Sequence, residues 1–110
     1  MKDDTLIDAR GLGAALQRFA DARDWNRYHS PRNLVLALVG EVGELAEIFQ
    51  WLDDDAAARL RDDPARFAHL REEIADVLFY LTRLAMVTGV DLDEAARDKL
   101  AKNAIKYPAP

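Results

Sequence analysis

Cysteine is absent from the 110 residues, and no run of apolar residues is long. Without cysteine the chain can form no disulfide framework. The longest apolar run, residues 34–39, is far below the roughly 20 residues that a membrane-spanning helix requires. The N-terminal segment MKDDTLIDAR is acidic and lacks the charged-then-apolar layout of a signal peptide, so we expect a cytoplasmic protein with no membrane partner.

An excess of positive charge is also lacking. The 20 acidic residues outnumber the 15 lysines and arginines, which leaves a net charge of −5. Proteins that bind duplex nucleic acid usually present a basic face to the phosphates, so this balance argues against a nucleic-acid partner. An anionic ligand would need positive charge from the lysines near the C-terminus, Lys99, Lys102 and Lys106, or from a divalent metal.

Strand-like alternation, internal repeats and low-complexity tracts are missing as well, and helical spacing dominates. It predicts helices at about 8–23, 31–51, 64–88 and 91–106, with one short helical turn in the polar connection at 52–63. Ser30, Asp63 and Asp91 have the residue types and positions of N-caps, and Gly89 is placed to end the third helix. The predicted fold class is all-α, an antiparallel helical bundle, in a single domain of residues 1–110 with its core at about 8–107.

Two of these helices carry acid pairs at the edge of their apolar faces. Glu41 and Glu44 lie three residues apart in the second helix, and Glu73 and Asp76 lie three residues apart in the third. Residues at this spacing share a helix face, so antiparallel packing of the two helices would bring four carboxylates together. Ionised carboxylates at a partly buried interface cost several kcal/mol each unless a cation compensates them.

A solvated helix face is the simpler interpretation of a single E-x-x-E pattern, because glutamate favours helices. Five of the six glutamates, however, fall in these two segments: Glu41, Glu44, Glu47, Glu72 and Glu73. The paired repetition favours a site for a hard divalent cation, Mg²⁺ or Mn²⁺. A di-iron site fits less well because the E-x-x-H motif of di-iron bundles does not occur.

Three segments resemble the all-α nucleoside triphosphate pyrophosphohydrolases of the MazG-like superfamily, and most closely its dCTP pyrophosphatase branch. They read ARDWNRYHSPRNLVLALVGEVGELAEIFQW, LREEIADVLFYL and VDLDEAARDKLAKNAIKYP, and the resemblance covers about residues 12–108. The E-x-x-E and E-x-x-D signature of that family matches Glu41, Glu44, Glu73 and Asp76.

The resemblance implies a Mg²⁺-dependent enzyme that cleaves a nucleoside triphosphate between the α and β phosphates, giving a monophosphate and pyrophosphate. The four signature acids would hold the metal, and Glu44 or Glu47 is the candidate for the base that activates water. The expected substrates are dCTP and its 5-modified forms. Two alternatives stay open: a broader house-cleaning enzyme for noncanonical nucleotides, and a non-catalytic helical assembly module.

The resemblance also suggests residues that bind the substrate. Trp25, Trp51 and Tyr80 match positions that enclose the nucleobase and sugar, although each could be a core or rim aromatic. His29 and Asn33 are either structural or in contact with the base. Candidates for phosphate contacts on the fourth helix are Lys99, Asn103 and, more weakly, Lys106.

Self-association is expected because four short helices with wide apolar faces leave apolar surface uncovered in a monomer. The resemblance implies a tetramer built as a dimer of dimers.

Overall fold

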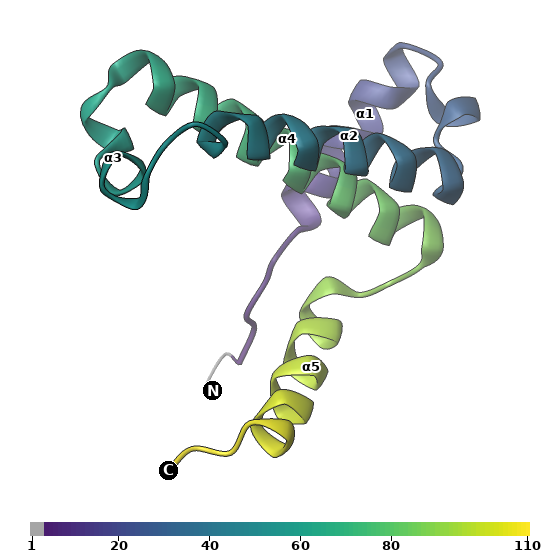
Figure 1. The fold of residues 1–110 in the computed structure, drawn as a ribbon. Coiled ribbons are helices and arrows are strands. Elements are labelled where there is room, and N and C mark those ends of the chain that lie inside the picture. Colours follow the sequence, from purple (N-terminus) through teal and green to yellow (C-terminus); the bar gives the residue numbers. More distant parts are fainter. Residues whose placement is uncertain (1–3) are drawn as a thin grey trace.

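A computed structural model of the chain describes residues 4–110, which fold into helices joined by short connections and contain no β-strand (Figure 1). The all-α prediction is thereby confirmed. In chain order the elements are α1 (Arg10–Ala22), a 3₁₀ turn (Asn26–Tyr28), α2 (Pro31–Phe49), α3 (Asp54–Ala58), a second 3₁₀ turn (Leu60–Asp62), α4 (Pro64–Thr88) and α5 (Leu92–Lys106).

Helix starts coincide with the predicted caps. The side chains of Ser30, Asp63 and Asp91 accept hydrogen bonds from backbone N–H groups three residues later, at 3.2, 3.2 and 3.0 Å. Each bond satisfies an N–H that would otherwise lack a partner in the first helical turn. Gly89 ends α4 with a φ of 79°, which is the left-handed conformation expected of a glycine at this position.

Some boundaries differ from the prediction. The first helix begins at Arg10 and not at residue 8, and the second ends at Phe49, short of Trp51. The connection at 52–63 holds both α3 and a 3₁₀ turn where one short turn was predicted, because the Asp53 side chain caps α3 by accepting from Ala56 N–H at 2.8 Å.

The body of the molecule is the antiparallel pair of α2 and α4, with α1 packed against α4. Leu34 on α2 is 2% exposed, and Ala20 on α1 and Ala85 on α4 are also buried. Gly13 of α1 lies against the side chain of Met86 of α4, since a Cβ at this position would stand 3.4 Å from the sulfur, an ordinary van der Waals contact.

The last helix departs from the predicted bundle. α5 points away from α2 and α4, and it packs extensively against no other helix of residues 4–110 (Figure 1). The radius of gyration is 17.0 Å, compared with about 13 Å for a compact chain of this length. A single chain is therefore an open arrangement of helices and not a closed four-helix bundle.

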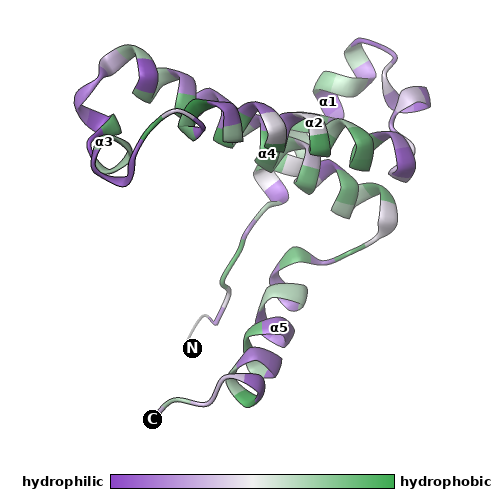
Figure 2. Cartoon of the chain, viewed as in Figure 1, coloured by the Kyte–Doolittle hydropathy of each residue, from purple (hydrophilic) through white to green (hydrophobic). Residues whose placement is uncertain are grey.

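Several residues of the predicted apolar faces remain partly exposed as a result. Val42 on α2 and Ile74 and Leu81 on α4 belong to these apolar faces, and about half of each residue is exposed. Figure 2 shows hydrophobic residues along both α2 and α4. None of the described helices is both long and apolar enough to cross a membrane.

Candidate metal and nucleotide site

The antiparallel pairing of α2 and α4 brings three of the predicted acids together. One carboxylate oxygen each from Glu41, Glu73 and Asp76 lies within 4.8 Å of the other two. Glu73 is buried, at 8% exposed, while Glu41 and Asp76 are half-buried. We call these three residues the acid cluster.

The carboxylates of the acid cluster are poorly solvated and repel one another. Burial, together with the charges of neighbouring carboxylates including Glu44, raises the pKa of both Glu41 and Glu73. The only basic side chain paired with the cluster among residues 4–110 is His69, whose Nε2 lies 3.4 Å from Glu73 Oε1. Glu41 Oε2 and Glu73 Oε2 are buried and accept no hydrogen bond. Buried carboxylate oxygens without donors fit the ligand set of a hard divalent cation.

The other two candidate acids lie outside the cluster. Glu44 is exposed and contributes no oxygen to the group of three, but its charge acts on both Glu41 and Glu73. Glu47, one turn further along α2, is also exposed, and no described contact ties it to the cluster. Of the two, Glu44 is the acid beside the cluster.

A cavity of about 480 Å³ opens next to the acid cluster, between α1, α2 and α4. Glu41 and Asp76 form part of its wall, so the cluster and the cavity are continuous. The rest of the wall is largely apolar and aromatic, from Leu12, Leu16, Phe19, Trp25, Leu34, Phe79 and Tyr80. Such a cavity suits the apolar body of a ligand whose charged end lies at the carboxylates.

Two of the predicted aromatic residues line this cavity. Trp25 packs edge-on against Phe19, with ring centroids 5.5 Å apart, and against His29, at 6.2 Å. Tyr80 is half-buried, and burial together with the charges of Glu41 and Asp76 raises the pKa of its hydroxyl. Trp25 keeps 42% of its surface exposed, so part of this side chain remains accessible to a ligand.

His29 lines the same cavity and is held by a residue that the sequence analysis did not single out. Arg83 of α4 donates from Nε to His29 Nδ1 at 3.0 Å, although the two residues are 54 positions apart in the chain. Arg83 is buried and lines the cavity as well. The one sequence signal for it is a charged residue inside the apolar stretch LFYLTRLAM.

The remaining candidates lie away from the cavity wall. Asn33 anchors the start of α2, since its Nδ2 donates to the Tyr28 carbonyl at 3.0 Å. Trp51 is 87% exposed beyond the end of α2. Lys99, Asn103 and Lys106 lie on α5, which a single chain does not bring to the acid cluster.

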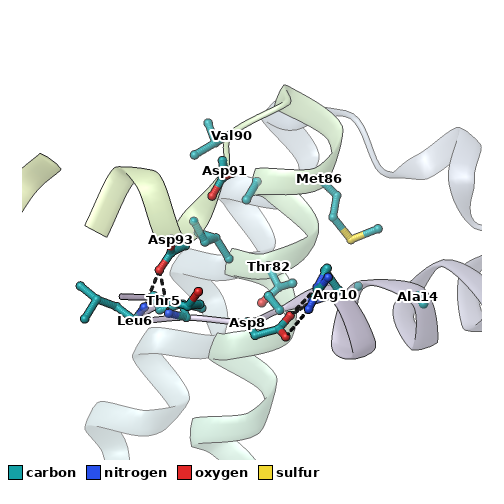
Figure 3. Close-up of a pocket in the computed structure, with 15 residues that line it drawn as sticks. Thr5, Leu6, Asp8, Arg10, Ala14, Thr82, Met86, Val90, Asp91 and Asp93 are labelled. Atoms are coloured by element: carbon teal, nitrogen blue, oxygen red, sulfur yellow. Dashed lines mark hydrogen bonds and ion pairs between the residues drawn. The ribbon is translucent and has the colours of Figure 1, made fainter. Parts of the chain in front are cut away.

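A second, larger cavity of about 840 Å³ lies between the N-terminal segment, α4 and the start of α5 (Figure 3). There Asp93 Oδ1 accepts from the backbone N–H groups of Leu6 and Ile7, at 2.6 and 3.0 Å. None of the predicted site residues lines this cavity, and the acid cluster lies elsewhere. Its polar groups join the N-terminal segment to α5.

Comparison with known proteins agrees with this geometry. Residues 29–109 match the family model of the MazG nucleotide pyrophosphohydrolase domain. Human dCTP pyrophosphatase 1 is 50% identical over 105 residues, which cover 96% of this chain and 60% of that protein. The bovine dCTP pyrophosphatase 1 is 49% identical over 104 residues, covering 94% of this chain and 60% of the relative. The chain thus spans about 60% of the length of the curated relatives it matches.

A solved structure shows that the likeness extends to the fold. The crystal structure of a pyrophosphatase from Archaeoglobus fulgidus superposes with a TM-score of 0.83 at 37% sequence identity, covering 99% of this chain and all of that one. The resemblance inferred from the residues is confirmed, and the chain belongs to the MazG nucleotide pyrophosphohydrolase family.

Proposed function

We propose that the protein is a divalent-metal-dependent pyrophosphohydrolase that cleaves a nucleoside triphosphate between its α and β phosphates. The observation that carries this proposal is the acid cluster, with two buried carboxylate oxygens that accept no hydrogen bond, at the edge of an aromatic-lined cavity. A metal-bound triphosphate would lie at the acids while its nucleoside occupied the cavity. Products would be a nucleoside monophosphate and pyrophosphate.

The proposed substrates are dCTP and its 5-modified forms. Human and bovine relatives named dCTP pyrophosphatase 1 are about half identical to this chain over 94–96% of its length. Removal of these triphosphates from the nucleotide pool is the corresponding cellular role.

Mg²⁺, or Mn²⁺, bound by Glu41, Glu73 and Asp76, would neutralise charge on the phosphates and activate water for attack on the α-phosphorus. Glu44, beside the cluster, takes the proton of that water in our proposal, and Glu47 is the less favoured alternative because no contact links it to the cluster. Trp25 stacks on the base and Tyr80 borders the sugar. Comparing Glu44→Gln with Glu47→Gln tests the base: a larger loss of kcat in Glu47→Gln would reverse the assignment.

Assembly is part of the proposal because α5 carries the candidate phosphate contacts, Lys99, Asn103 and Lys106, away from the acids of its own chain. We propose a tetramer, built as a dimer of dimers, in which neighbouring subunits complete each site. The exposed apolar residues of α2, α4 and α5 support this assembly, since patches of this kind mark interaction surfaces.

A panel assay tests the function. Purified protein is incubated with Mg²⁺ and each nucleoside triphosphate in turn, including 5-methyl-dCTP, and the products are separated by ion-exchange chromatography. We expect monophosphate and pyrophosphate, formed fastest from dCTP or its 5-modified forms. Faster cleavage of a triphosphate with another base would support the broader house-cleaning role. No cleavage with either Mg²⁺ or Mn²⁺ would favour the alternative of a non-catalytic assembly module.

A further inference from the structure

Arg83 is a buried cation with no carboxylate in direct contact. Its guanidinium is held by three neutral acceptors: His29 Nδ1 at 3.0 Å, Gln17 Oε1 at 2.6 Å and Asn26 Oδ1 at 2.6 Å. The residue is 6% exposed, and no ion pair to it occurs within residues 4–110. A buried charge without a direct counterion destabilises the folded state, so the presence of Arg83 at this position suggests a functional role.

The countercharge comes through two side-chain amides. Gln17 Nε2 and Asn26 Nδ2 both donate to Asp21 Oδ1, at 2.8 and 2.7 Å, while their oxygens accept from Arg83. These bonds and the charge of Arg83 lower the pKa of Asp21, so this carboxylate stays ionised. The orientations of both amides are fixed from two sides, which makes the Arg83 guanidinium a rigid group.

This arrangement fixes the proton of His29. A guanidinium has only N–H donors, so His29 Nδ1 must offer a lone pair and the ring proton must lie on Nε2. Burial and the charge of Arg83 also lower the pKa of His29, which keeps the ring neutral. Nε2 has no hydrogen-bond partner in the part of the chain that the structure describes, although His29 lines the cavity.

Donors therefore dominate the polar wall of the cavity. Besides the carboxylates of the acid cluster and the hydroxyl of Tyr80, its polar side chains are Trp25, His29 and Arg83. Arg83 already occupies the lone pair of His29 Nδ1, so these three side chains have only N–H groups left to offer a ligand. Arg83 follows Asp76 by seven residues on α4, which places it about 10 Å further along the helix axis. The cavity thus runs from the metal-binding acids at one end to a wall of donors at the other.

We propose that Arg83 is a positioning residue that holds His29 as an Nε2–H donor, and that this wall of donors selects cytosine over uracil. Cytosine presents two adjacent acceptors, O2 and N3. Uracil also has two acceptors, O2 and O4, but they flank N3–H, so a pair of adjacent donors that fits cytosine would set one donor against that hydrogen. A site built to donate rejects such a base because its own N–H groups stay unpaired. The inference rests on the proposed function for the identity of the ligand as a nucleotide.

The tautomer of His29 can be measured on the unmodified protein. Long-range ¹H–¹⁵N spectra of the imidazole rings at neutral pH distinguish a protonated from an unprotonated nitrogen, and a His29→Gln sample separates the signals of His29 from those of His69. We expect Nδ1 unprotonated and Nε2 protonated. An Nδ1–H tautomer, or a doubly protonated ring, would overturn the inference without any variant at Arg83.

Base selection is tested with a matched pair of variants. Arg83→Leu removes the donor to His29, whereas Gln17→Ala disturbs the same network and leaves that donor in place. We expect the dCTP to dUTP ratio of kcat/KM to fall about tenfold in Arg83→Leu, through KM, and to change less than about twofold in Gln17→Ala. Arg83→Lys keeps the buried charge but loses the planar guanidinium, so it should behave like Arg83→Leu. It replaces the leucine variant in this test if that variant does not fold.

An unchanged ratio in the folded Arg83 variants, or an equal loss in Gln17→Ala, would reduce Arg83 to a structural role. Calorimetric binding of dCMP and dUMP separates this inference from the proposed function because it needs no turnover. If wild-type protein prefers dCMP and Arg83→Leu does not, yet no triphosphate is cleaved, the proposed function alone fails. If dCTP is cleaved but the wild type binds both monophosphates equally, the role of Arg83 alone fails.

Discussion

The packing around the acid cluster holds its carboxylates in an environment that disfavours their charged form. Glu73 is buried with one oxygen unpartnered, and burial together with the nearby charges raises its pKa and that of Glu41. Stability alone would favour an apolar or amide side chain at such a position. A cost of this kind is typical of functional sites, where residues are selected for what they bind.

Glu73→Gln should separate function from stability. We expect hydrolysis of dCTP to fall by on the order of a hundredfold to a thousandfold, because a metal ligand is lost. Without metal the same variant should melt at a higher temperature, because one of the repelling charges is gone. Glu72→Gln, the exposed neighbour on the same helix, is the control and should change neither quantity. Full activity in Glu73→Gln would remove this residue from the site.

At the scale of the elements, local sequence signals predicted the helices well but did not predict the long-range contacts between them. Ser30, Asp63, Asp91 and Gly89 act within three residues of their own position, so each could be predicted from sequence. The short helix α3 was underestimated for lack of an apolar pattern, although its cap is also local.

The network around Arg83 could not be predicted in the same way. Its partners are 54 to 66 residues distant in the chain, and nothing in helical spacing pairs an arginine of α4 with Gln17 of α1. The acid cluster was easier to predict from sequence, because each of the two helices carries an acid pair at the edge of its apolar face. The direction of α5 was missed because no local sequence signal says whether a helix packs against the rest of its chain, and α5 packs extensively against no other helix of residues 4–110.

Gly89→Ala tests the end of α4. A side chain at a φ of 79° costs about 1 to 2 kcal/mol, so the free energy of unfolding should fall by that amount in chemical denaturation. Gly11→Ala lies in the first turn of α1 with open space around it, and it should gain about 0.5 kcal/mol from better helix propensity. Equal effects of the two substitutions would refute the conformational explanation.

The whole molecule is open, and its exposed apolar surface favours association. Leu100 on α5 is 59% exposed, and within residues 4–110 this helix packs extensively against no other helix. Light scattering during size-exclusion chromatography should give a mass near that of a tetramer of 12.4 kDa chains for the wild type.

Leu100→Glu should lower that mass, because a charge would be buried at the interface. Lys102→Glu introduces the same side chain about 200° around the helix and should leave the mass unchanged. A monomeric wild type, or dissociation by both variants alike, would argue against an interface on this face of α5.

The stability of the whole molecule should depend on pH and metal together. Burial and neighbouring charges raise the pKa values of Glu41 and Glu73 in the folded chain. At pH values between the ordinary and the raised pKa, the folded chain therefore binds more protons than the unfolded chain. The contribution of these two groups to stability is therefore largest below the ordinary value and is lost as the pH rises through this window. Asp8, with a pKa lowered to about 2, acts in the opposite sense, and its contribution is lost as the pH falls from 3.8 toward 2.

Because metal binds only ionised carboxylates, Mg²⁺ should raise the melting temperature more at about pH 7.5 than at about pH 5. Differential scanning calorimetry with Mg²⁺ or with EDTA measures this difference. Glu73→Gln should reduce the effect of Mg²⁺ at the higher pH. An equal effect of Mg²⁺ at both pH values would place its binding elsewhere.

The most direct measurement follows the oxygen of the attacking water. Hydrolysis of dCTP in H₂¹⁸O with Mg²⁺, analysed by mass spectrometry, reveals which phosphorus is attacked. Attack on the α-phosphorus predicts dCMP that carries one ¹⁸O, unlabelled pyrophosphate, and no products when EDTA replaces Mg²⁺. Label in the pyrophosphate, release of single phosphates, or cleavage that continues in EDTA would contradict a metal-dependent pyrophosphohydrolase at the acid cluster.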